Sequence, residues 1–290
     1  PGDIKNFAKD IETVWKKKSH SKKAFNYFRD KSRGAIKDDT SSYVLKQKIN
    51  TLPLNWDQTK RNIVYFTSSQ DEYAALGGEY DKIIYKDQFE SIKEIAKAIK
   101  KKKDKNIFFW IKCHPNLENV FWNYHKKVFT LHDPKNNIFV IPPSSKVSTY
   151  SILKVCEKVI TFNSLIGIES VYWKKPSIII GRRVYEKLDC IYKPKSHNQT
   201  MSLIFNKNLK PKPVTGAYKY SVHWVEGGSK LKYLSGSMYH NKDFSFKDFV
   251  FKLKNLDYLA YNFEKFKQFY IYNYLISYVL KKFINYLKRN

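Results

Sequence analysis

The feature that most constrains the fold is a regular alternation between residues 61 and 215. Short apolar runs of strand length alternate there with segments whose apolar residues recur at helical spacing. This alternation predicts strand–helix–strand units, and therefore an α/β fold with a parallel, Rossmann-like sheet and helices on both faces. We expect strands at 63–66, 107–112, 138–141, 159–162 and 178–180, and helices at 88–102, 119–130, 150–156 and 165–173.

Polar residues follow every one of these expected strands. The carboxyl ends of parallel strands meet at one edge of a sheet, where open α/β sheets bind their ligands. Hydroxyl, histidine and arginine side chains would gather at that edge, which favours a phosphate-bearing ligand. Any one of these segments is also typical of an ordinary turn, so it is their convergence that matters. The segments are 67–72, 113–116, 142–145, 163–164 and 181–183.

The segment VITFNSLIGIES, residues 159–170, is the most informative single stretch. Asn163 and Ser164 are residue types that cap helices, and backbone N–H groups at a helix start attract anions. Gly167 lacks a side chain where a ligand would approach. Glu169 offers a carboxylate to ribose hydroxyls. The alternative is an ordinary strand-to-helix junction in which Ser164 only caps its helix, and the residues alone leave both interpretations open.

The chain is strongly basic, with a formal net charge of +28 from 54 Lys and Arg against 26 Asp and Glu. This balance suits nucleic acid, an acidic membrane surface or a phosphorylated substrate. The lysines are spread along the chain, so a solvated basic surface is also consistent with it. We find no helix-turn-helix, zinc-finger or RNA-binding motif, so nucleic acid is not expected as a partner.

The three cysteines, Cys113, Cys156 and Cys190, lack metal-ligand spacing. We therefore expect no metal site, and the buried thiols would be typical of a cytoplasmic protein. No run of 18 apolar residues occurs, so no membrane-spanning helix is expected. The chain begins with Pro1 and shows no signal peptide, which suggests a processed chain or a fragment.

We expect three parts: a helical segment and linker at 1–56, an α/β domain at 57–215, and a basic, aromatic-rich helical tail at 216–290. Within the tail, residues 269–287 carry a polar stripe beside a wide Tyr-rich apolar face. That pattern suits peripheral contact with the inner face of the cytoplasmic membrane, but it equally suits packing against protein.

Several motifs give the chain a family resemblance over roughly residues 45–215. The segments NIVYFTSSQDEYAALGGEYDKIIYKDQ, IKCHPNL, NIFVIPPSSKVSTYSIL and VITFNSLIGIESVYWKKPSIIIGRRVYEKLDCIYKPKSH resemble the carboxyl-terminal half of bacterial capsular and surface polysaccharide biosynthesis proteins. Those proteins are similar to GT-B glycosyltransferases, including the CMP-sugar-using Kdo transferases and sialyltransferases.

The resemblance implies a glycosyltransferase, or its donor-binding domain, in surface polysaccharide synthesis. Its donor would be a nucleotide-sugar such as a CMP-linked sugar, and its acceptor a glycan or a lipid-linked glycan. By position, His114 matches a His-Pro motif and Ser164 a Ser-containing turn that hold the donor. The donor-binding set implied in this way is Ser68, Ser69, Lys112, His114, Asn163, Ser164, Gly167, Glu169 and Arg182.

For catalysis, the resemblance gives His114 a hydrogen bond to the leaving phosphate. Asp71 and Glu72 are candidates for acid–base work, although acidic residues at a helix start also have a simple capping role. GT-B enzymes pair two Rossmann-like domains and only one is visible here, so no general base is assigned. No cofactor is expected beyond the substrates. The alternatives are a non-catalytic membrane-associated scaffold and a basic nucleic-acid-binding protein.

Overall fold

The structure is a computed structural model that describes residues 4–36, 41–69, 84–119 and 124–227, together with two short strands. It divides into two compact units, residues 1–228 and 229–290. In the second unit, strands β6 (Leu234–Ser235) and β7 (Ser245–Phe246) pair antiparallel. The expected membrane-contact segment 269–287, and both Asp71 and Glu72, lie outside the described residues.

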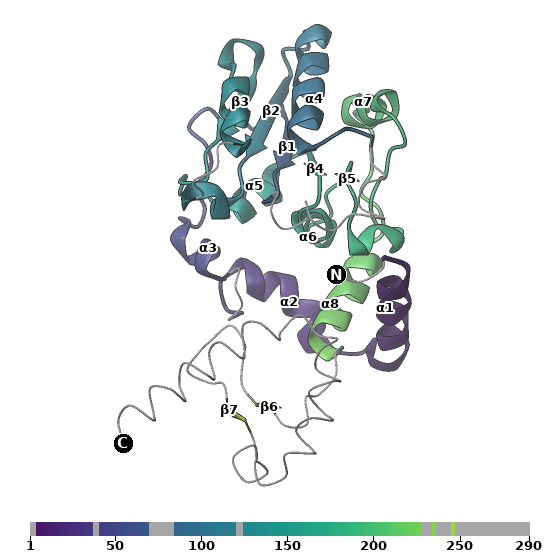
Figure 1. The fold of residues 1–290 in the computed structure, drawn as a ribbon. Coiled ribbons are helices and arrows are strands. Elements are labelled where there is room, and N and C mark those ends of the chain that lie inside the picture. The colour runs from purple at the N-terminus through teal and green to yellow at the C-terminus, as the bar shows by residue number, and fades with distance from the viewer. Residues whose placement is uncertain are drawn as a thin grey trace, which may run out of the picture. The chain divides into compact units, whose positions relative to one another are not determined.

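The first unit is built on a five-stranded sheet in the order β3-β2-β1-β4-β5, in which every neighbouring pair is parallel (Figure 1). All five expected strands are present, each within two residues of its expected bounds. Strands this apolar suit a sheet that is covered on both faces. The strands are β1 (Arg61–Phe66), β2 (Ile107–Lys112), β3 (Ile138–Ile141), β4 (Lys158–Thr161) and β5 (Ser177–Ile179).

Helices cover both faces of the sheet, as expected. On one face α4 (Gln88–Lys102) and α7 (His197–Phe205) contribute to a core that includes Tyr65 and Ile111. On the other face α5 (Thr149–Val155) packs over alternate residues of the same strands. The remaining helices are α1 (Ile4–Lys18), α2 (Lys22–Ser32), α3 (Ser41–Lys46), α6 (Ile166–Tyr172) and α8 (Thr215–Glu226). The 3-10 helices are η3 (Pro115–Asn119), η4 (Tyr124–Leu131), η5 (Pro134–Asn136) and η6 (Val184–Lys187).

Helix α4 shows why the sequence folds this way locally. The side chain of Asp87 caps its start by accepting a hydrogen bond from Glu90 N at 2.8 Å. Ile92, Ile95 and Ile99 then recur at helical spacing and are all buried. The chain leaves the helix through Lys103, whose φ of 53° is left-handed.

The expected helix at 119–130 is different in the structure. Residues 124–130 of this stretch belong to the 3-10 helix η4 rather than to an α-helix, and Asn119 ends the 3-10 helix η3. Val128, Phe129 and Thr130 are β-branched or aromatic residues, which lose side-chain freedom in an α-helix. Their limited helix propensity accounts for the difference.

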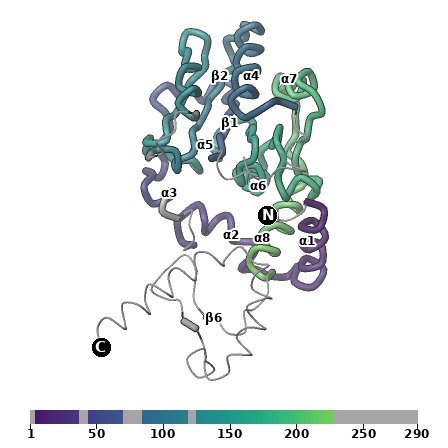
Figure 2. The backbone as a smooth tube through the Cα atoms, viewed as in Figure 1, coloured from purple at the N-terminus to yellow at the C-terminus, as the bar shows by residue number. Residues whose placement is uncertain are grey.

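A third layer lies beyond α6, where α1, α2 and α8 pack together (Figure 2). Phe28 of α2 stacks on Tyr220 of α8, with ring centroids 6.3 Å apart and an interplanar angle of 15°. Ile11 of α1 and Ala217 of α8 are fully buried in the same cluster. The amino-terminal helices thus bury their apolar faces against α8, within the first compact unit.

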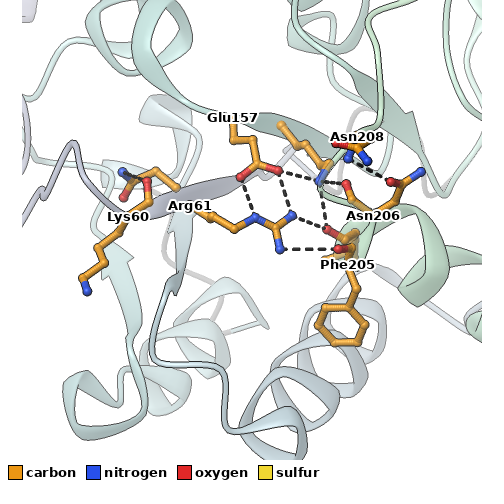
Figure 3. A network of polar contacts seen from close by, with 9 residues as sticks. Lys60, Arg61, Glu157, Phe205, Asn206 and Asn208 are labelled. Carbon is orange, nitrogen blue, oxygen red and sulfur yellow. Dashed lines mark hydrogen bonds and ion pairs between the residues drawn. The ribbon is translucent and has the colours of Figure 1, made fainter.

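At the amino ends of β1 and β4, a network of ionic and polar contacts fastens α7 to the sheet (Figure 3). Arg61 donates to both carboxylate oxygens of Glu157, at 2.8 Å each. The Lys158 ammonium donates to Glu157 at 2.6 Å, to the Ile204 carbonyl at 3.0 Å and to the Asn206 carbonyl at 2.6 Å. Every buried charge at this edge therefore has a partner within the chain.

No helix in the described part of the chain is long and apolar enough to cross a membrane.

Candidate functional site

The site lies at the carboxyl edge of the sheet, where the strand order changes direction around β1. Strand β2 lies on one side of β1 and β4 on the other, so the loops that follow these two strands diverge at this point. Thr67 follows β1, and its backbone N–H donates to the Lys112 carbonyl at 3.0 Å. The Thr67 hydroxyl accepts a hydrogen bond from His114 N at 2.9 Å. The loop after β1 therefore fixes the backbone of the His-Pro loop.

Ser68 ties the loop after β1 to the loop after β4. Its backbone N–H donates to Gln88 Oε1 at 2.7 Å, and Gln88 Nε2 donates back to the Ser68 carbonyl at 3.1 Å. The Ser68 hydroxyl accepts a hydrogen bond from Asn163 N at 3.2 Å. Ser68 and Ser69 are both buried, so the structure places them within the wall of the site.

Asn163 extends this chain of hydrogen bonds to the loop after β5. Its side-chain Oδ1 accepts a hydrogen bond from Arg182 N at 2.9 Å. A Cβ at Gly181 would lie 2.4 Å from the Phe162 carbonyl oxygen and 2.7 Å from Asn163 Oδ1, so only glycine fits there. The loops after four of the strands are thus held together by the backbone and by short side chains.

His114 stands half-buried directly after β2. Its ring Nδ1 accepts a hydrogen bond from Asn116 N at 3.2 Å. Since Nδ1 is the acceptor, a neutral ring carries its proton on Nε2. In that tautomer Nε2 is the hydrogen-bond donor of the ring.

Lys112, the last residue of β2, is the most unusual group at this edge. It lies in register between Phe66 and Ile141, so apolar side chains flank it on the same face of the sheet. It is only 2% exposed, and its ammonium has no hydrogen-bond partner within the described residues. Burial lowers its pKa to about 8. A buried unpaired cation is costly, and a bound anion would supply the missing partner.

Arg182 begins the loop after β5 and is held by Glu186 of η6. Arg182 Nε donates to the two carboxylate oxygens of Glu186 at 3.1 and 2.9 Å, and Lys193 donates to the same carboxylate at 2.5 Å. The Glu186 side chain is fully buried. Burial acts to raise its pKa, but the hydrogen bonds from Arg182 and Lys193 outweigh it, and the pKa of Glu186 lies below its ordinary value.

Glu169, which was expected to offer its carboxylate to a ribose, is buried in the structure. The residue is 2% exposed, and both of its carboxylate oxygens are already engaged. One pairs with the Lys31 ammonium of α2 at 3.0 Å, and the other accepts from the Tyr150 hydroxyl of α5 at 2.7 Å. Glu169 therefore joins α6 to α2 and α5, because a buried carboxylate needs such partners.

The expected role of Gly167 is also different in the structure. A Cβ at this position would lie 2.2 Å from the Tyr185 hydroxyl and 2.9 Å from Thr161 Oγ1. The missing side chain thus makes room for Tyr185 rather than for a ligand. Tyr185 in turn donates to the Ser164 carbonyl at 2.5 Å.

Ser164 is not the residue that caps α6. The helix begins at Ile166, with Leu165 at the N-cap position and no side-chain cap hydrogen bond. The Ser164 hydroxyl instead accepts a hydrogen bond from Ile166 N at 3.3 Å, which makes a local turn. Ser164 still lies at the carboxyl edge, directly after Asn163.

Several residues that shape the site were not predicted from the sequence: Lys31, Tyr150, Glu186 and Lys193. Lys31 and Tyr150 meet Glu169 only through the tertiary fold, so no local pattern marks them. Glu186 stands four residues after Arg182, a spacing that signals an ion pair on a helical turn. That spacing is the one signal that was available.

The described residues hold no group of three or more His, Cys, Asp or Glu side chains that could bind a metal ion. The three cysteines are free and buried, and burial raises the pKa of each to about 12. A thiol with such a pKa is almost fully protonated at neutral pH and is a poor nucleophile. The cysteines are core residues.

No curated protein sequence matches this chain. Among solved structures, two forms of Thermosulfurimonas dismutans KpsC are similar to it. The beta Kdo 2,4 transferase has 10% identity and a TM-score of 0.40, covering 70% of this chain and 56% of that one. The beta Kdo 2,7 transferase has 16% identity and a TM-score of 0.40, covering 85% and 67%. TarM has 18% identity and a TM-score of 0.36, covering 63% and 35%. Likenesses this distant assign no residue roles.

The sequence itself gives a firmer relationship. Residues 18–197 match the family described as capsule polysaccharide biosynthesis protein. This match spans more than half of the chain and includes the whole parallel sheet with the loops at its carboxyl edge. The chain therefore belongs to the family of capsule polysaccharide biosynthesis proteins.

Proposed function

We propose that this chain is a glycosyltransferase, or the donor-binding part of one, that transfers a sugar from a nucleotide-sugar in capsular polysaccharide synthesis. Building a polysaccharide requires glycosidic bonds made from activated sugars, and nucleotide-sugars carry a phosphate as the leaving group. The observation that carries the proposal is the buried ammonium of Lys112, which lacks a partner in the described residues at the edge where α/β sheets bind ligands.

In this proposal the donor phosphate binds beside the loops that follow β1, β2 and β4. Lys112 neutralises part of its charge, and His114 donates a hydrogen bond from Nε2. As the bond between the sugar and the phosphate breaks, negative charge grows on the phosphate oxygens. Donors that are already held in place stabilise that charge without reorganising, which lowers the barrier. The linked loops of Thr67, Ser68 and Asn163 supply this rigidity.

Further parts of the proposal rest on the sequence. The donor is a nucleotide-sugar such as a CMP-linked sugar, and the acceptor is a glycan or lipid-linked glycan. Asp71 and Glu72 are the acid–base candidates. Residues 269–287 are proposed to contact the inner face of the cytoplasmic membrane peripherally. Deleting them should then move the protein from the membrane fraction to the supernatant, whereas a lower melting temperature with unchanged partitioning would assign them to protein packing.

Calorimetric titration with CMP, UDP and GDP tests the donor site. We expect one nucleotide to bind, and His114→Ala to weaken that binding about tenfold to a hundredfold, because a charge-assisted hydrogen bond contributes roughly 1.5–3 kcal/mol. The melting temperature should change little because His114 is only half-buried. The matched control is His20→Ala, since His20 is exposed in the turn between α1 and α2.

Two results would contradict the proposal. If His114→Ala unfolded the protein but left nucleotide affinity unchanged, His114 would be a core residue and the site would be misplaced. If no nucleotide bound, while random DNA bound with a steep salt dependence, the basic chain would instead be a nucleic-acid-binding protein.

A further inference from the structure

Arg182 is fixed in place at both ends. Its backbone N–H is bonded to Asn163 Oδ1 at 2.9 Å, and its Nε is bonded to the buried carboxylate of Glu186. Gly181, immediately before it, has no room for a side chain. The loop that carries Arg182 is thus held by the same chain of hydrogen bonds that links the other loops of the site.

The rest of the guanidinium is available for a ligand. Contacts between Arg182 and the described part of the chain run through Nε and the backbone, and the two terminal amino groups make none there. The side chain is 13% exposed, so those amino groups sit in a largely desolvated setting. A planar guanidinium presents paired donors that match two oxygens of a phosphate.

The charges around Glu186 also favour an anion. The single carboxylate pairs with two cations, Arg182 and Lys193, so the group retains one surplus positive charge. Its ionised form is stabilised by those same hydrogen bonds. Glu186 therefore orients Arg182 without cancelling the positive charge of the cluster as a whole.

We propose that Arg182 contacts a phosphate of the donor through its terminal amino groups, and that Glu186 is the positioning residue that aims them. This rests on the proposed function, because it assumes that the donor binds at the carboxyl edge of the sheet. Glu186 itself touches no ligand. Its effect on binding acts through Arg182, which makes the proposal testable as a coupling between two side chains.

The experiment is a double-mutant cycle read by calorimetric titration, with CMP and inorganic pyrophosphate as probes. We expect Arg182→Ala to weaken binding about tenfold to a hundredfold. Glu186→Gln, which keeps the shape but removes the charge, should weaken binding about tenfold in the wild-type background. In the Arg182→Ala background it should have almost no further effect.

Two further variants keep the test sharp. Lys187→Ala removes one positive charge from an exposed lysine of η6 and should change affinity less than about twofold. Arg182→Lys keeps the charge but loses the paired donors of the guanidinium. Its affinity for the probes should therefore lie between that of Arg182→Ala and that of the wild type. This variant decides the matter if Glu186→Gln does not fold.

The proposal is overturned if Arg182→Ala, or Arg182→Lys, binds both probes as the wild type does. It is also overturned if Glu186→Gln weakens binding equally in the two backgrounds, since Glu186 would then act independently of Arg182. If the wild-type protein bound neither probe, the proposed donor site itself would fail, and this inference with it.

Discussion

A buried lysine lies at each end of the parallel sheet, and the two lysines differ in their hydrogen-bond partners. Lys158 stands at the amino end of β4 and Lys112 at the carboxyl end of β2, and both are almost fully buried. Lys158 donates to a carboxylate and two carbonyls, whereas Lys112 has no partner among the residues described. Burial lowers the pKa of both, but the hydrogen bond that Lys158 donates to Glu157 partly restores that of Lys158. The chain can therefore satisfy a buried ammonium, and the described residues at the carboxyl edge do not.

The arginines at the two edges repeat the contrast. Arg61 uses Nε and a terminal amino group to pair with both oxygens of Glu157, and another donates to the Phe205 carbonyl at 3.3 Å. Arg182 pairs with its glutamate through Nε alone. One edge thus has its donors satisfied internally and serves stability. At the other edge, the terminal amino groups of Arg182 have no partner in the described part of the chain, as the proposed binding of a phosphate requires.

The largest effect should come from breaking the satisfied edge. Lys158→Met should lower the free energy of unfolding by about 2–4 kcal/mol, because it leaves buried carbonyls unpaired and removes one partner of Glu157. Urea denaturation at neutral pH measures this. A loss below about 0.5 kcal/mol would mean that the network in Figure 3 adds little to stability.

The matching substitution at the carboxyl edge should change the free energy of unfolding in the opposite direction. Lys112→Met should raise the free energy of unfolding by about 1–3 kcal/mol at pH 7, because it removes a buried charge that has no partner among the described residues. The control is Lys93→Met, since Lys93 is exposed on α4. Destabilisation by Lys112→Met at pH 7 would contradict the unpaired state of the ammonium.

The pH dependence of the stability gained by Lys112→Met follows from the lowered pKa of Lys112. The pKa of Lys112 is lowered from 10.5 to about 8 in the folded state. Below about pH 8 Lys112 is protonated in both the folded and the unfolded state, and the full penalty of about 3 kcal/mol for burying its charge is present. Between pH 8 and 10.5 the unfolded state binds more protons, so the stability of the wild-type protein rises with pH. The advantage of Lys112→Met should therefore shrink over that window, as denaturation at several pH values would show.

Much of the fold was predictable because it depends on local patterns. Apolar runs located all five strands, and apolar residues at helical spacing located α4. The gathering of loops at one edge followed from parallel strands alone. The packing of α8 on the amino-terminal helices was not predictable, because no local pattern says which distant surface an apolar helix face will meet.

The residues that gather at the carboxyl edge were predictable, but the contacts of their side chains were not. Residues near strand ends fall at the carboxyl edge by topology, as Lys112 and His114 do. What their side chains contact is set by distant residues: Glu169 pairs with Lys31 across 138 positions of sequence. Gly167 likewise accommodates Tyr185, a contact that only the folded chain reveals. A sequence shows which groups are present, whereas their being paired or unpaired is a tertiary property.

The most direct test of the contrast is nucleotide affinity in the two lysine variants. Calorimetric titration of CMP, UDP and GDP at pH 7 should show Lys112→Met binding at least about tenfold more weakly than the wild-type protein. Lys158→Met should stay within about twofold at a temperature where it remains folded, although it removes a buried lysine from the same sheet. Equal nucleotide affinity of Lys112→Met and the wild type would contradict the proposal that the Lys112 ammonium, which has no partner among the described residues, binds an anion of the donor.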